Sequence, residues 1–255
     1  MSTVQSVTRA LSILNVLAEH PNGIKITTLA SELELSKATV HRLLATLISS
    51  NYVRQDPDTE RYKIGYQIVS LATHFLNHFD IIEVAKPHLT KLSNDINETV
   101  HLCIEDKGQA LYIDKIESTQ PIAMYSRIGT RAPMYCTAVG KVLLSGMSPT
   151  KYGEVVQEIQ FNQVTTHTIN SAESLATEIK LVKEQKYAID EQEITEGVRC
   201  LAFPLYNFKG EIVASFSVSG PVNRITEQYL HDSLKEKMRE TANTISRELG
   251  HLHSL

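Results

Sequence analysis

The sequence has 255 residues, of which 42% are hydrophobic and 21% are charged, so it is long enough for one large or two modest globular domains. Its net charge of −4 argues against a protein that coats nucleic acid by charge alone, but leaves room for a localised basic surface. Apolar runs stay well short of the ~18 residues of a membrane span, the N-terminus lacks a secretory-signal pattern, and three widely spaced cysteines make no disulfide framework, so we expect a cytoplasmic protein.

Residues 1–66 carry the pattern of three helices followed by a β-hairpin. Apolar residues at helical spacing predict a first helix around residues 7–17, a second over 27–34 and a third over Lys37–Ser49. Two short strands then flank a polar turn at residues 56–58. Three helices and a hairpin in this order predict a winged helix-turn-helix domain.

Residues 26–45 match the helix-turn-helix spacing in detail. Ala30 supplies the small side chain needed where the two helices cross, so that the second helix can enter a major groove. Glu34 stands where glycine is common, which leaves the turn conformation open. Arg61 also flanks the predicted hairpin. The alternative to a DNA-binding domain is a small helical domain that binds protein. The predicted DNA contacts are Ser36, Lys37, Thr39, His41, Arg42, Arg54 and Tyr62.

The rest of the chain predicts a linker helix over residues 67–80 and an α+β domain over residues 81–255. Further helices are expected over residues 81–96, Ala138–Ser145, 171–185 and from Thr226 towards Leu252. The expected strands cover residues 99–104, 110–116, 122–126, 187–190, 198–205 and 212–219. Their hairpin signals indicate a mostly antiparallel sheet with segregated helices.

These motifs together resemble the IclR family of bacterial transcription regulators. The matches are LSKATVHRL at residues 35–43, GTRAP at 129–133, TAVGK at 137–141, GVRCLA at 197–202 and SVSGP at 217–221. Residues 98–102 and 124–129 are similar to the KdgR-type branch, which represses pectin and hexuronate breakdown genes and responds to 2-keto-3-deoxygluconate. The resemblance implies a winged helix, a linker helix and a GAF-like ligand domain, in dimers that pair again into tetramers.

The resemblance also implies an effector pocket for a small 2-keto acid or sugar acid. Free N–H groups where the helix from Ala138 begins favour a carboxylate. Ser217 and Ser219 point to one face of a strand, and Asp190 suits ligand hydroxyls, whereas the direction of Arg127 is open. The implied effector residues are Met124, Ala138, Val139, Asp190, Cys200, Ser217 and Ser219.

We therefore expect a DNA-binding regulator, in the simplest case a repressor, whose partners are a double-stranded DNA operator and a small-molecule effector. We expect no cofactor, no metal and no membrane partner. An architectural DNA binder without an effector is a weaker alternative, because residues 67–255 carry more acidic than basic side chains.

The alternative from another class is a cysteine-dependent enzyme that acts on a small molecule, with Cys200 as nucleophile and His101 as base. Blocking the thiol separates the two hypotheses, because an enzyme loses turnover and a sensor loses only ligand affinity. Paired histidines at 74/78 and 251/253, and His101 with Cys103, lack the partners of a zinc-finger site.

Overall fold

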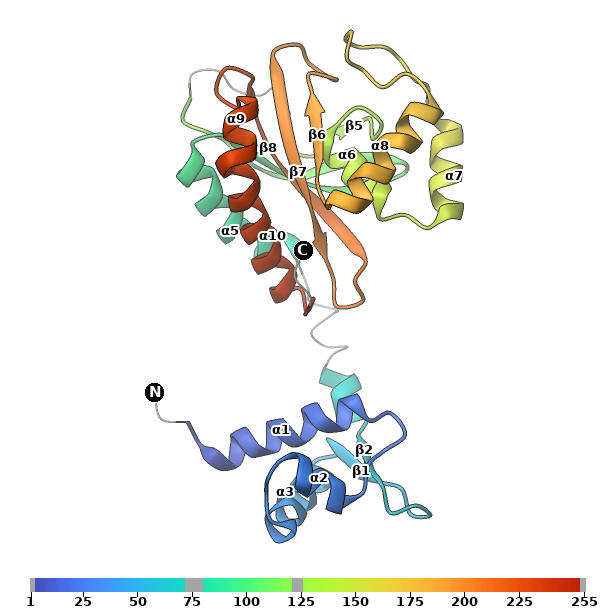
Figure 1. The fold of residues 1–255 in the computed structure, drawn as a ribbon, viewed down its shortest axis with the longest axis vertical. Coiled ribbons are helices and arrows are strands. Elements are labelled where there is room, and N and C mark those ends of the chain that lie inside the picture. The colour runs from blue at the N-terminus through green and yellow to red at the C-terminus, as the bar shows by residue number, and fades with distance from the viewer. Residues whose placement is uncertain (1–2, 72–79, 121–125, 253–255) are drawn as a thin grey trace. The chain divides into compact units, whose positions relative to one another are not determined.

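The computed structural model describes residues 3–71, 80–120 and 126–252. It divides into two compact units, Met1–Phe79 and Asp80–Leu255 (Figure 1). Each unit has a hydrophobic core of its own. Within the described residues, no helix combines the length and the apolar character that crossing a membrane requires.

The N-terminal unit has the predicted order of helices and strands. Its elements are α1 (Gln5–Glu19), α2 (Ile26–Glu32), α3 (Lys37–Ser49), β1 (Val53–Gln55) and β2 (Tyr62–Ile64). β1 and β2 pair as an antiparallel hairpin, and Ile24 forms an isolated bridge with Tyr62. This is a winged helix-turn-helix, as predicted.

The crossing of α2 and α3 has the close approach that Ala30 was expected to allow. Ala30 is 7% exposed and belongs to the buried cluster that contains Val40 and Leu44 of α3. The Leu35 N–H donates to Ala30 O at 3.0 Å and closes the turn. Glu34 has a φ of +53°, so this residue adopts the left-handed conformation in which glycine is usual, at a cost on the order of 1 kcal/mol.

The C-terminal unit is built on an antiparallel sheet. Its helices are α5 (Ile81–Ile96), α6 (Ala138–Ser145), α7 (Pro149–Glu158), α8 (Ala172–Gln185), α9 (Glu227–Tyr229) and α10 (Lys235–Glu248), with a π-helical turn over Leu230–Leu234. Its strands are β3 (Thr99–Asp106), β4 (Gln109–Ile116), β5 (Arg131–Ala132), β6 (Ala188–Glu191), β7 (Val198–Tyr206) and β8 (Ile212–Pro221). They lie in the order β5-β4-β3-β8-β7-β6.

Helices cover both faces of this sheet (Figure 1). α5 and α10 pack together on one face, and α6 lies on the other face against β7 and β8, with α8 beside it. Every residue of α6 from Ala138 to Leu144 is buried, because the helix is enclosed between the sheet and α8. Side chains on the α6 face of the sheet are therefore shielded from solvent.

Several predicted boundaries differ from the structure. α7 was not predicted, although Ser148 caps it and Pro149 starts it, and its apolar residues are only partly buried. The expected helix from Thr226 is interrupted by the π-helical turn and ends at Glu248. The predicted linker helix is helical over residues 67–71, and the remainder to residue 79 lies outside the described residues, as do residues 122–125 of an expected strand.

Candidate DNA-binding and effector sites

The leading end of α3 presents polar side chains to solvent. Lys37, His41 and Arg42 are exposed, while Val40 is fully buried beneath them. The Ser36 Oγ accepts from the Thr39 N–H at 3.2 Å and lies 2.8 Å from Thr39 Oγ1. These two hydroxyls thus stabilise the start of the helix, and Ser36 remains exposed beside the three cationic or titratable side chains.

The two arginines of the hairpin are held by contacts within the unit. The Arg54 guanidinium lies 5.1 Å from the centre of the Tyr66 ring, and its Nε donates to Ile64 O at 3.4 Å. Arg61 Nη1 donates to Gly23 O at 3.1 Å. Both side chains are exposed, so their remaining donors face solvent on the wing.

The structure corrects the role predicted for Tyr62. Its side chain is only 7% exposed and packs in the core of the N-terminal unit, where its backbone pairs with Ile24. Desolvation raises the pKa of the Tyr62 hydroxyl. Tyr62 alternates with exposed Arg61 along the strand, so we reassign it from a DNA contact to a core residue.

The predicted effector residues of the sheet all lie on the face that packs against α6. In the strand register Asp190 pairs with Cys200, and Cys200 pairs with Ser219, so the three side chains are direct neighbours across β6, β7 and β8. Ser217 lies two residues before Ser219 on β8, so its side chain points to the same face of the sheet. The exposed fractions of the four lie between 1% and 8%, so this polar row is part of the protein interior.

The start of α6 packs over this polar row and shields it from solvent. Ala138 and Val139 are 1% and 3% exposed and share a buried cluster with Cys200. Thr137 Oγ1 accepts from the Gly140 N–H at 3.3 Å and also donates to Pro133 O. The structure thereby brings together six of the seven predicted effector residues, and the seventh, Met124, lies outside the described residues. Arg127 is exposed.

Burial dominates the electrostatics of the polar row. Desolvation raises the pKa of Asp190 from 3.8 to about 7, although the Glu193 N–H donates to its Oδ1 at 2.7 Å. Desolvation also raises the pKa of the Cys200 thiol well above its usual value, with the Asp190 charge adding to the effect. A thiol held protonated in this way is a poor nucleophile.

His101 and Tyr112 belong to the same interior although no effector role was predicted for them. His101 is the cross-strand partner of Ser217 and is 2% exposed, and its ring lies 5.1 Å from that of Tyr112. Burial, with the Lys115 charge, lowers the pKa of His101 to about 3, so it is a weak base and does not suit the enzyme hypothesis. Thr99, His101 and Cys103 alternate along the strand predicted over residues 99–104, and this pattern could have placed His101 on the inward face.

A buried charge network lies beside the polar row. Lys141 of α6 is 1% exposed, and its Nζ lies 2.6 Å from Glu193 Oε1 and 3.0 Å from Glu178 Oε1. The Glu193 backbone N–H in turn donates to Asp190. The network therefore joins α6, α8 and the loop after β6 to a predicted effector residue.

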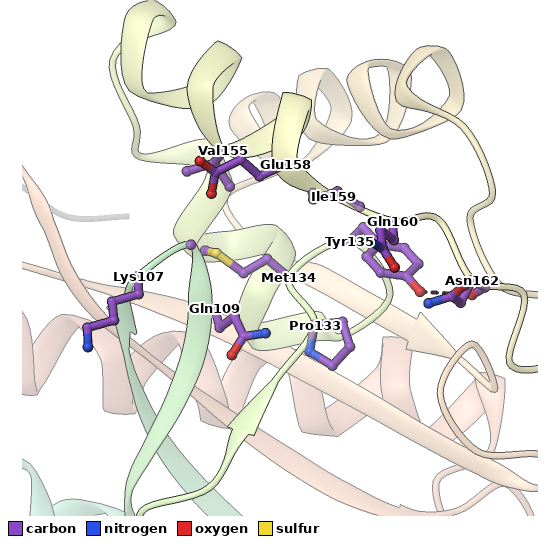
Figure 2. Close-up of a pocket in the computed structure, with 11 residues that line it drawn as sticks. Lys107, Gln109, Pro133, Met134, Tyr135, Val155, Glu158, Ile159, Gln160 and Asn162 are labelled. Carbon is purple, nitrogen blue, oxygen red and sulfur yellow. Dashed lines mark hydrogen bonds between the residues drawn. The ribbon is translucent and has the colours of Figure 1, made fainter.

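A separate cavity of about 350 Å³ opens between the β3–β4 turn, the segment before α6 and the end of α7 (Figure 2). Met134 and Tyr135 form part of its wall, and the Tyr135 hydroxyl donates to Asn162 O at 2.8 Å. None of the six predicted effector residues that the structure describes lines this cavity. Within the part of the chain that the structure describes, no cluster of three metal-ligating side chains occurs, and His251 stacks on Tyr206.

Comparison with known families gives two matches that together span most of the chain. Residues 6–57 match the model of the IclR helix-turn-helix domain, and residues 73–247 match the model of the bacterial transcriptional regulator IclR C-terminal domain.

Individual relatives agree over nearly the full length. The chain is 35% identical to the HTH-type transcriptional regulator XynR of Escherichia coli over 98% of this chain and 99% of that protein. It is 36% identical to the HTH-type transcriptional regulator KdgR of Dickeya chrysanthemi, over 98% of this chain and 81% of the relative. The crystal structure of the Agobacterium tumefaciens repressor BlcR superposes with a TM-score of 0.87 at 28% identity, over 99% of this chain and all of the other.

Proposed function

The chain belongs to the IclR family of bacterial transcriptional regulators, and we propose that it is a repressor whose operator affinity is controlled by a small acidic metabolite. The relatives are transcriptional regulators and not enzymes, which leaves the cysteine-enzyme hypothesis without support. The observation that carries the proposal is the exposed polar end of α3 above the buried Ala30 crossing.

The proposed DNA contacts come from α3 and the wing. The N-terminal residues of a recognition helix lie nearest the base edges, which supports base or phosphate contacts by Lys37, His41 and Arg42. An arginine in this position forms paired hydrogen bonds with guanine or binds a phosphate. The proposed set is Ser36, Lys37, Thr39, His41, Arg42 and Arg54.

The proposed effector is a 2-keto acid or sugar acid, with 2-keto-3-deoxygluconate as the candidate suggested by the KdgR-type resemblance. The start of α6 offers backbone N–H groups and the positive end of a helix dipole to a carboxylate. The serine hydroxyls and Asp190 provide donors and acceptors for the remaining oxygens. The proposed set is Met124, Ala138, Val139, Asp190, Cys200, Ser217 and Ser219.

We further propose that the chain acts as a homodimer or as a tetramer formed by two dimers. Two copies would place two α3 helices in successive major grooves of a near-palindromic site. Val4, which directly precedes α1, and Val7 and Leu11 of α1 are 64%, 55% and 56% exposed. These apolar side chains, three and four residues apart, suit contact with a second copy. Binding to a bacterial chromosome places the protein in the cytoplasm.

In this proposal residues 1–66 bind DNA, residues 67–80 form a linker helix and residues 81–255 bind the effector. Effector binding between α6 and β8 favours one arrangement of the C-terminal units, and the linker passes that preference to the spacing of the DNA-binding units. Coupling of this kind amounts to about 1–3 kcal/mol, or roughly 5–150-fold in affinity.

Selection from a random pool of DNA duplexes tests the DNA-binding part. The full chain is expected to enrich a near-palindromic sequence, and Arg42→Ala is expected to weaken binding to it while leaving effector binding intact. Lys151→Ala, an exposed cation in the C-terminal unit, serves as the control for loss of a positive charge. Equal binding by wild type and Arg42→Ala would remove Arg42 from the reading role, and a pool without any enriched sequence would contradict the proposed function.

A further inference from the structure

His101 lies next to both serines proposed to bind the effector. It faces Ser217 directly across the β3–β8 pair, and its Nδ1 lies 3.4 Å from Ser219 Oγ. Its other ring nitrogen, Nε2, lies 2.6 Å from Ser126 Oγ. With 2% of its surface exposed, the imidazole is fixed between two hydroxyl groups inside the protein.

The tautomer of the imidazole decides which of the two hydroxyls accepts from the ring and which donates to it. A neutral imidazole has one N–H donor and one acceptor nitrogen, whereas a hydroxyl can donate one hydrogen bond and accept others. Burial and Lys115 keep His101 neutral at physiological pH because they lower its pKa to about 3. When Nδ1 carries the proton and donates to Ser219 Oγ, the Ser126 hydroxyl donates to Nε2.

In that arrangement the hydrogen of the Ser219 hydroxyl is directed away from His101. Ser219 lies on the face of the sheet that packs against the start of α6, where the effector is proposed to bind. A hydroxyl that accepts from one neighbour and donates to another suits a ligand group that can only accept. Carboxylate and keto oxygens are such groups.

We propose that His101 is a positioning residue of the effector site, which holds the Ser219 hydroxyl as a donor toward a carboxylate or keto oxygen of the effector. The proposal rests on the function proposed above. It explains why a buried histidine stands at a point where the sheet otherwise carries serine, cysteine and aspartate. It also assigns a class of ligand group to Ser219. Without His101, the Ser219 hydroxyl could serve either as donor or as acceptor toward the effector.

The test uses the full chain and measures binding of 2-keto-3-deoxygluconate and pyruvate by isothermal titration calorimetry. His101→Leu removes both ring nitrogens, whereas His101→Asn keeps an amide N–H near the position of Nδ1. We expect His101→Leu to weaken binding by about tenfold or more, and His101→Asn to stay within about threefold of wild type.

A double-mutant cycle separates positioning from simple packing. If His101 acts through Ser219, then Ser219→Ala combined with His101→Leu should bind no more than about twofold more weakly than Ser219→Ala alone. Ser215→Ala is the control, because Ser215 is fully buried on the same strand but donates to Phe203 O. It should leave affinity unchanged.

Three results would overturn the proposal: wild-type affinity in His101→Leu, a loss in His101→Asn as large as in His101→Leu, or additive losses in the double variant. Should His101→Leu not fold, His101→Phe takes its place, because it retains a ring against Tyr112. If the wild-type chain binds neither compound, the effector class proposed above fails, and the role of His101 fails with it.

Discussion

Replacing Asp190 by asparagine removes a buried charge but keeps the hydrogen-bond acceptor. Asp190 is 1% exposed, and its Oδ1 accepts from the Glu193 N–H at 2.7 Å, a bond that an asparagine oxygen can also form. The change therefore tests how much free energy of unfolding the protein loses when this carboxyl group ionises.

The size and sign of the effect follow from the pKa of Asp190. Desolvation raises that pKa from 3.8 to about 7, so the folded state favours the neutral acid. The stability linked to this group is fully present below pH 3.8 and is lost as the pH rises through about 7. At about 1.36 kcal/mol for each pH unit between the two values, the loss reaches about 4 kcal/mol. The Asp190→Asn protein does not lose this stability as the pH rises, because asparagine does not ionise.

The assay is urea unfolding of both proteins between pH 4 and pH 8. Unfolding is monitored by the reaction of the cysteines with 4,4′-dithiodipyridine. All three cysteines are buried and lie in the C-terminal unit, so their labelling reports the unfolding of that unit alone. The stability of Asp190→Asn relative to wild type should rise from pH 4 to about pH 7 and then level off. A difference that stays constant over this range refutes the argument.

Two further experiments test the buried ion pair of Lys141 and the helix crossing at Ala30. Lys141→Met leaves Glu193 buried without its cation and should destabilise the C-terminal unit by about 3–5 kcal/mol, and adding Glu193→Gln should recover much of the loss in the same assay. Ala30→Leu overpacks the helix crossing and should cost about 1–3 kcal/mol in the N-terminal unit. Operator binding should then weaken while cysteine labelling is unchanged, and normal binding would show that a small side chain is not needed there.

The periodicity of apolar residues predicted most of the fold. Lys107 and Gly108 lie between the strands predicted over residues 99–104 and 110–116, and their φ values of +54° and +74° are those of a tight hairpin turn. Elements with little buried surface were missed, as the two-residue strand β5 and the partly buried α7 show. β5 is too short to show a periodic pattern, whereas Ser148 and Pro149 did mark the start of α7.

The sites depended on information that the sequence holds only in part. The alternation of Arg61 and Tyr62 should have placed one of them inside, and the structure shows that Tyr62 is the buried one. The contact of His101 with Ser219 joins residues 118 positions apart and depends on the register of β3 and β8. From the sequence alone, Lys141 is expected on the surface. It is buried because α8 and the loop after β6 place the carboxylates of Glu178 and Glu193 beside it.

The most direct test of effector-controlled DNA binding is a titration of the selected operator with the full chain, with and without saturating 2-keto-3-deoxygluconate. The compound is expected to weaken operator binding by wild type by about fivefold or more. The variant that combines Ser217→Ala with Ser219→Ala should bind the operator normally and no longer respond. Equal wild-type affinity in both conditions, or a full response by the double variant, would contradict it.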